Sequence, residues 1–89
     1  MNDHPAATTI TVDLPGEGTF VVPFEAIALD RANYMARQAT GSGPSPGNDQ
    51  YDAVVESELQ FALGRPDILN DWVYRHMRHS ELAPYRAPA

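Results

Sequence analysis

Two β-branched segments near the start of the chain have apolar residues at every second position. Ile10 and Val12 alternate with Thr and Asp in residues 8–13, and Phe20 and Val22 lie two apart in residues 19–22. The intervening residues 14–18, Leu-Pro-Gly-Glu-Gly, have turn chemistry, so the pattern predicts a β-hairpin. Because a two-stranded ribbon alone is barely stable, we expect its apolar face to pack on helices.

Three later segments have apolar residues at the i, i+3, i+4 spacing of a helix face. The first is predicted over residues 23–38 with Pro23 at its first position, and the second over 50–63 with Asp49 as N-cap and Gly64 as stop. The third begins at Pro66 and ends near His79, with Trp72 assigned to the core. The predicted apolar faces consist of Phe24, Ile27, Ala28, Tyr34 and Met35; of Tyr51, Val54, Val55, Leu59 and Ala62; and of Ile68, Leu69, Trp72, Val73 and His76.

The segments define one small α+β domain over residues 8–79, with a β-hairpin packed on about three α-helices (ββααα). Residues 1–7 are predicted to be a flexible N-terminus. Residues 40–48, rich in Gly, Ser and Pro, are predicted to be a flexible linker. Residues 80–89 are predicted to be an extended C-terminal tail, with Leu82 or Tyr85 as its anchor.

Composition narrows the class of protein. The chain has 89 residues, no cysteine and a formal charge of −6, from 12 acidic side chains against six basic ones, all of which are Arg. Scarce cations disfavour direct binding of nucleic acid and favour a basic protein partner. The lack of cysteine and of a long apolar run predicts a cytoplasmic protein with no membrane association.

The acidic residues cluster on the last two predicted helices, at Asp49, Asp52, Glu56, Glu58, Asp67 and Asp71. Such a surface can imitate the phosphates of a nucleic acid and occupy a basic groove. The alternative is that these carboxylates only complement helix dipoles and form a solvated face. Tyr74, with Arg75 and Arg78, forms a second candidate contact surface, since aromatic and Arg side chains often dominate interfaces.

The sequence contains few residue combinations that could support catalysis. His76 and His79 have a spacing that zinc sites use, and Asp71, Glu81 or His4 could add ligands, but no spacing supplies a dedicated third ligand. No activated nucleophile or phosphate-binding loop is present. The sequence therefore predicts a protein that is not an enzyme and needs no cofactor, with a small metal-dependent enzyme as a third hypothesis.

The run Val22-Pro23-Phe24-Glu25-Ala26-Ile27-Ala28-Leu29-Asp30-Arg31-Ala32-Asn33-Tyr34-Met35-Ala36, the acidic helix that follows and Asn70-Asp71-Trp72 together resemble a group of short acidic proteins encoded by phages and prophages. The resemblance covers about two-thirds of the chain. After Trp72 the chain departs from these proteins, because residues 73–78 stand where they have an asparagine-rich ending. It implies a phage accessory protein that inhibits a host defence complex. An anti-CRISPR protein, which blocks a nucleic-acid-binding effector by protein contact, is the sharpest form of this expectation.

The leading hypothesis is therefore a non-catalytic inhibitor that docks its acidic helices on a basic surface of a nucleic-acid-binding host protein. The second hypothesis is a structural or assembly accessory protein of a phage or host complex, self-associating as a homodimer. Salt separates the two, because steering charges are screened whereas an apolar self-interface is not.

Overall fold

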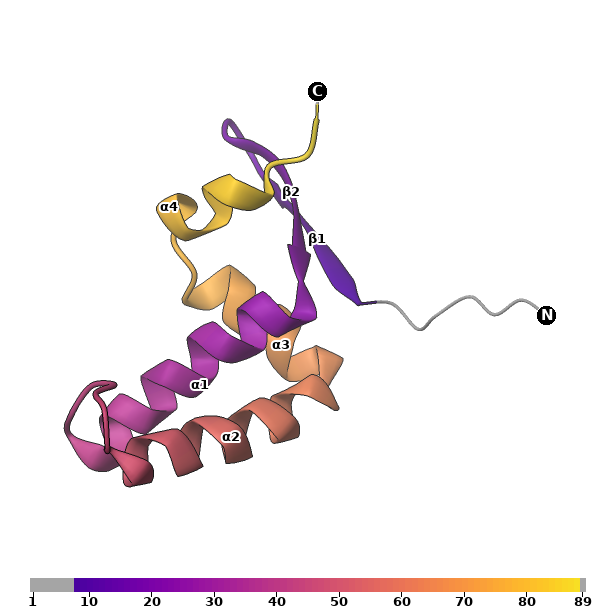
Figure 1. The fold of residues 1–89 in the computed structure, drawn as a ribbon. Helices are drawn as coiled ribbons and strands as arrows, with labels where there is room; N and C mark the ends of the chain where they lie inside the picture. The colour runs from indigo at the N-terminus through magenta and orange to yellow at the C-terminus, as the bar shows by residue number, and fades with distance from the viewer. Residues whose placement is uncertain (1–7, 89) are drawn as a thin grey trace.

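The structure is a computed structural model that describes residues 8–88, so the predicted flexible N-terminus, residues 1–7, lies outside the described residues. The fold is α+β, with a β-hairpin followed by helices, as predicted (Figure 1). In chain order the elements are β1 (Thr9–Leu14), β2 (Gly18–Pro23), α1 (Phe24–Thr40), α2 (Asp49–Leu63), α3 (Pro66–Arg75), α4 (His79–Leu82) and a 3₁₀ turn (Ala83–Tyr85).

The hairpin has the register that its apolar pattern predicts. Ile10 is paired with Val22, and Val12 with Phe20, so all four lie on one face. Gly16 in the connecting turn has a φ of 81°, which glycine adopts without a steric cost. Val12, Phe20 and Val22 are fully buried, which shows that this face of the hairpin belongs to the core.

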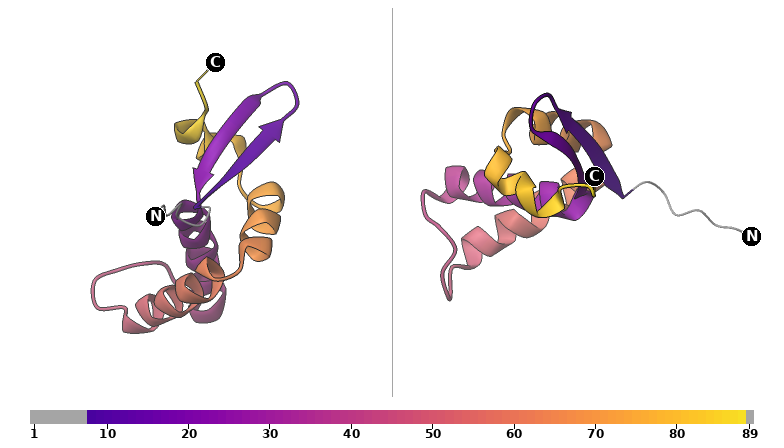
Figure 2. Two further views of the ribbon diagram at one scale, coloured as in Figure 1. Left: turned by 90° about the vertical axis from the view of Figure 1, so that its right-hand side faces the viewer. Right: turned by 90° about the horizontal axis from the view of Figure 1, so that it is seen from above.

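The helices arrange around that face in two groups. α1 follows the hairpin directly, and α2 packs antiparallel to α1 (Figures 1 and 2). α3 and α4 then pass beside the start of α1 and reach the hairpin. Small residues Ala32 and Ala36 are fully buried on α1 and allow α2 to approach closely. The core is formed mainly by Val12, Phe20, Val22, Ile27, Ala28, Ala62, Leu69, Trp72, Val73 and Leu82.

Two predicted core positions are wrong. Tyr34 is 46% exposed, because it lies on the edge of the buried face of α1, which centres on alanines. His76 is exposed and ends α3 as its C-cap, instead of lying inside a longer helix. The N-cap of α2 also differs from the prediction: the Asn48 carboxamide oxygen accepts from the Tyr51 N–H at 3.2 Å, so the cap lies one residue before Asp49.

The predicted extended tail is wrong over residues 80–85, which are helical. Helix α3 ends at Arg75, and a new helix, α4, begins at His79. The Glu81 carboxylate accepts from the Arg78 N–H at 2.7 Å, which caps the start of α4. The change of direction between α3 and α4 brings the Leu82 side chain into the core, where it is 1% exposed. Leu82 is thus the anchor that the sequence suggested, while Arg86 forms an isolated bridge with Phe20 on β2.

None of the helices in residues 8–88 combines the length and the apolar content needed to cross a bilayer.

Candidate functional site

The exposed side of α2 carries a row of carboxylates, which we call the α2 stripe: Asp49, Asp52 and Glu56. Their spacing of three and then four residues places them on one side of the helix. All three residues are exposed, and none forms an ion pair within residues 8–88. The stripe is a surface of unneutralised negative charge.

The other three carboxylates of the predicted acidic surface each bind an arginine. Their ion pairs are Glu58–Arg31 at 2.8 Å, Asp67–Arg65 at 2.9 Å and Asp71–Arg75 at 2.8 Å. The hydrogen bonds from Arg65 lower the pKa of the Asp67 carboxyl. The Arg31 side chain is only 12% exposed, so Glu58 points into the α1–α2 interface and away from the stripe. The six predicted residues therefore do not form one continuous surface.

The second predicted surface is also divided. Tyr74 is 50% exposed, as a contact residue requires, whereas Trp72 is 6% exposed and belongs to the core as predicted. Arg75 is paired with Asp71, and Arg78 lies beyond the end of α3 and lines a separate cavity. Tyr74 remains as an isolated aromatic on the outside of α3.

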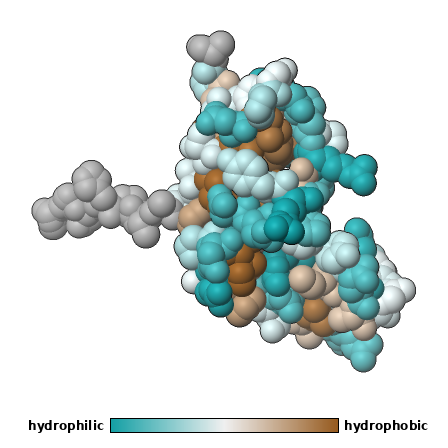
Figure 3. Space-filling view, turned by 180° about the vertical axis from the view of Figure 1, so that it is seen from behind, coloured by the Kyte–Doolittle hydropathy of each residue, from teal (hydrophilic) through white to brown (hydrophobic). Residues whose placement is uncertain are grey.

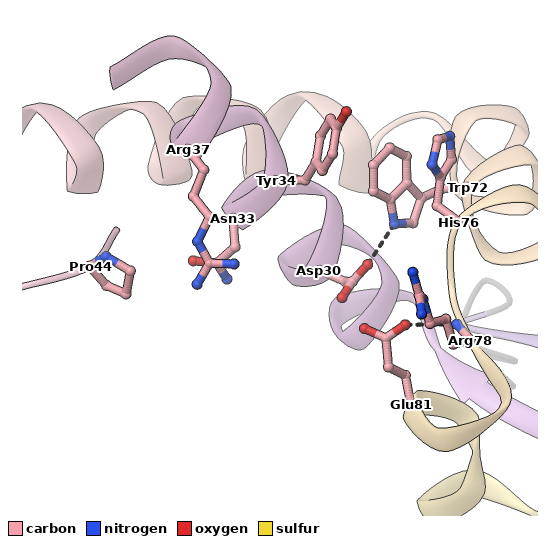
Figure 4. Close-up of a pocket in the computed structure, with 9 residues that line it drawn as sticks. All are labelled: Asp30, Asn33, Tyr34, Arg37, Pro44, Trp72, His76, Arg78 and Glu81. Atoms are coloured by element: carbon pink, nitrogen blue, oxygen red, sulfur yellow. Dashed lines mark hydrogen bonds between the residues drawn. The ribbon is translucent and has the colours of Figure 1, made fainter. Parts of the chain in front are cut away.

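The cavity that Arg78 lines has a volume of about 670 Å³ and lies between α1, α3 and α4 (Figure 4). Trp72 lines one side of it, where the indole Nε1–H donates to Asp30 Oδ2 at 2.8 Å. The His76 ring stacks on the indole at 3.9 Å between centroids, and the Tyr34 ring meets it edge-on at 5.3 Å. The lining residues are Asp30, Asn33, Tyr34, Arg37, Pro44, Trp72, His76, Arg78 and Glu81.

The carboxyls of Asp30 and Glu81 lie next to each other in this cavity (Figure 4). Burial raises the pKa of the Asp30 carboxyl, and the neighbouring Glu81 raises it further; the Trp72 hydrogen bond and His76 oppose the shift. The arrangement places the Asp30 carboxyl, with its raised pKa, among aromatic and guanidinium groups. It contains no Ser, Thr, Cys or Lys side chain among its lining residues.

Sequence reasoning did not identify this cavity, although α1 carries a pattern that points to it. Asp30, Asn33, Tyr34 and Arg37 follow the i, i+3, i+4, i+7 spacing of one helix side. A polar row beside an apolar one is ordinary for a surface helix, so the pattern alone does not separate a cavity wall from a solvated face. The contribution of α4 does not follow from the sequence, because residues 80–89 are predicted to be an extended tail.

The two histidines of the metal hypothesis have different surroundings. His76 stacks on Trp72, whereas His79 packs edge-on against Phe20 and lies 3.5 Å from the Glu17 carboxylate. Within residues 8–88, no group of three or more His, Cys, Asp and Glu side chains has a geometry that could hold a metal ion. His4 lies outside the described residues.

Hydrophobic residues on the face in Figure 3 form separate areas divided by hydrophilic ones. The large exposed apolar residues are Val21, Leu29, Tyr34, Phe61 and Tyr74. The guanidinium groups of Arg31 and Arg65 lie over the Phe61 ring at 5.7 and 5.8 Å, so that this aromatic is partly engaged by cations.

Comparisons of the chain with protein-family models, with curated proteins and with solved structures found no match.

Proposed function

We propose that this chain is a non-catalytic acidic binding protein that docks α2 on a basic surface of a nucleic-acid-binding host protein. The observation that carries the proposal is the α2 stripe: Asp49, Asp52 and Glu56 are exposed together and have no cation beside them in residues 8–88. A regular row of carboxylates on a rigid helix presents negative charge much as a nucleic-acid backbone does. A groove lined with Arg and Lys therefore provides the complementary surface.

The charge of the whole molecule supports this role. With a formal charge of −6, the chain attracts a basic partner from a distance and accelerates their encounter, while it is repelled by nucleic acid. Several of the few arginines are already engaged, as Arg31, Arg65 and Arg75 pair with carboxylates. The remaining imbalance is thus concentrated on surfaces such as the α2 stripe.

The specific form of the proposal is a phage-encoded inhibitor of a host defence complex, comparable to an anti-CRISPR protein. It would act as a DNA mimic by occupying the surface on which an effector binds nucleic acid. The phage origin and the defence target rest on the resemblance of residues 22–36, the acidic helix over residues 51–63 and residues 70–72 to small phage proteins. The docking of α2 rests on the charges of this chain alone.

The test is affinity capture with the tagged chain from a bacterial lysate, followed by direct binding of the captured protein after its purification. We expect a nucleic-acid-binding protein whose affinity for the chain falls as salt is added and whose nucleic acid competes with the chain. Capture of only the chain itself or of virion proteins would favour the structural accessory role instead.

A pair of matched double variants locates the surface. Asp52→Lys with Glu56→Lys reverses two charges of the α2 stripe, and Asp67→Lys with Asp71→Lys makes the same change, with the same spacing, on α3. We expect the α2 pair to abolish binding and the α3 pair to retain most of it. Equal loss from both pairs would indicate a response to net charge only, and loss from the α3 pair alone would reject the α2 stripe.

A further inference from the structure

The two edges of the β-hairpin are not equivalent. Beside β2, Arg86 forms an antiparallel bridge with Phe20, and the Ala87 N–H donates to the Thr19 carbonyl at 2.8 Å. Beside β1, no backbone hydrogen bond joins the outer edge to another segment within residues 8–88. The left view of Figure 2 shows the C-terminal segment next to β2 and β1 on the outside of the hairpin. An unpaired strand edge is a template for another strand.

The hydrogen-bond pattern identifies which groups that edge presents. The Phe24 N–H donates to the Thr8 carbonyl at 2.8 Å, so residues 8, 10, 12 and 14 direct their backbone groups toward β2. Thr9, Thr11 and Asp13 therefore direct theirs outward. β2 obeys the same alternation, because its outward-directed Thr19 is the residue that accepts from Ala87.

We propose that this edge is a self-association surface, on which β1 pairs antiparallel with β1 of a second copy about a two-fold axis at Thr11. In this register Thr11 lies opposite the second copy's Thr11, and Thr9 lies opposite the second copy's Asp13. All three outward-directed residues of each strand then form hydrogen-bonded pairs. The two hairpins become one four-stranded antiparallel sheet.

The side chains of β1 suit a second copy of the same strand. Asp13 is the charged residue of β1, and the axis at Thr11 keeps the two Asp13 carboxylates at opposite ends, whereas an axis at Asp13 would place them face to face. Thr–Thr pairs are favourable across antiparallel strands. Val21, 40% exposed, already lies beside Thr11, so a continuous row of valine and threonine would cross the new sheet.

This inference does not depend on the proposed function, and salt separates the two. Two copies with a formal charge of −6 repel each other, so added salt should strengthen self-association, whereas it should weaken docking of α2 on a basic partner. The two surfaces also lie on different elements, so that variants on β1 and on α2 can be examined separately.

The experiment is sedimentation velocity of the full chain over a wide range of concentrations at high salt, with the 9.8 kDa monomer as reference. Thr11→Pro removes an outward N–H that the hairpin does not use, and thereby two central hydrogen bonds of the dimer; we expect about tenfold weaker association or more. Thr11→Lys, compared with wild type at moderate salt, places like charges opposite each other and should weaken the dimer, although it reduces the magnitude of the net charge. Thr11→Val keeps the N–H and should retain the dimer.

A site-specific readout is backbone amide exchange of the wild type at low and high concentration. The amides of Thr9, Thr11 and Asp13 should exchange more slowly at high concentration, while those of Ile10 and Val12 are protected at both. A wild type that stays monomeric at every concentration, or a dimer that Thr11→Lys leaves unchanged, would overturn the proposal. If Thr11→Pro fails to fold by circular dichroism, the Thr11→Lys variant and the exchange pattern decide.

Discussion

The indole of Trp72 on α3 donates its Nε1–H to the Asp30 carboxylate on α1 at 2.8 Å, so that two residues 42 positions apart in the chain join these helices. This hydrogen bond allows the Trp72 ring to be buried while its N–H still has an acceptor. The ring is large enough to fill the core, yet its N–H must find an acceptor when it is buried. Asp30, at the border of the core, supplies that acceptor and faces the cavity with its other oxygen.

Substitutions of Trp72 should separate burial from hydrogen bonding. Trp72→Ala removes both and should lower the free energy of unfolding by about 3–5 kcal/mol. Trp72→Phe keeps most of the apolar contact but leaves Asp30 without its donor, so a smaller loss of about 1–3 kcal/mol is expected. Urea unfolding followed by circular dichroism measures both values. Equal losses in the two variants would show that the hydrogen bond, and not the ring, dominates.

The Asp30 carboxyl should give the protein an unusual dependence of stability on pH. Burial, and then Glu81, hold its pKa in the folded protein above the ordinary 3.8, so the folded state binds the proton more tightly than the unfolded state. Stability from this group therefore falls as the pH rises through the window between 3.8 and the raised pKa, and is constant above it. A carboxylate in an ion pair has the opposite effect, because its contribution to stability rises as the pH rises.

Asp30→Asn isolates this contribution. The asparagine can still accept from Trp72 through its carbonyl oxygen, but it does not titrate and does not repel Glu81. Unfolding by urea from about pH 4 to about pH 7 should show wild type gaining stability relative to the variant toward acid pH. A difference between the two proteins that is independent of pH would mean that the Asp30 pKa is unperturbed by folding.

The elements near the N-terminus could be predicted from sequence because their information is local. Alternation at Ile10, Val12, Phe20 and Val22 defines the hairpin and its buried face, since a shift of one residue would expose all four. The position of Trp72 on the apolar face of its helix also predicts that it is buried. The sequence does not predict that Tyr34 is exposed, because α1 packs through alanines, which give a weak apolar pattern.

The parts that escaped prediction depend on contacts between distant segments. The sequence suggests Leu82 as an anchor, but nothing within residues 80–89 indicates that Leu82 lies on a helical turn, which fits in the space that the hairpin and α3 leave. The acidic surface illustrates the same limit. Composition shows the excess of carboxylates, but only the fold shows that Glu58 pairs with Arg31 while Glu56 remains exposed.

The Arg31–Glu58 ion pair should stabilise the packing of α1 on α2. The Arg31 side chain is 12% exposed and also lies over the Phe61 ring, so loss of its partner leaves a charge poorly hydrated. Glu58→Gln should cost about 1–3 kcal/mol in unfolding free energy. Glu56→Gln, on the exposed α2 stripe, is the control and should stay within about 0.5 kcal/mol of wild type. Equal effects would place both residues on the surface.

Leu82 tests whether the C-terminal segment belongs to the folded domain. Its side chain is 1% exposed and contacts the core, so Leu82→Ala should leave a cavity and cost about 2–5 kcal/mol in unfolding free energy. Leu29→Ala is the matched control, because Leu29 is 47% exposed on α1 and the same truncation there should change stability by about 0.5 kcal/mol or less. A neutral Leu82→Ala would return residues 80–85 to the extended tail that the sequence predicts. A large loss would instead show that α4, with Glu81 beside Asp30, is held in place by a side chain buried in the core.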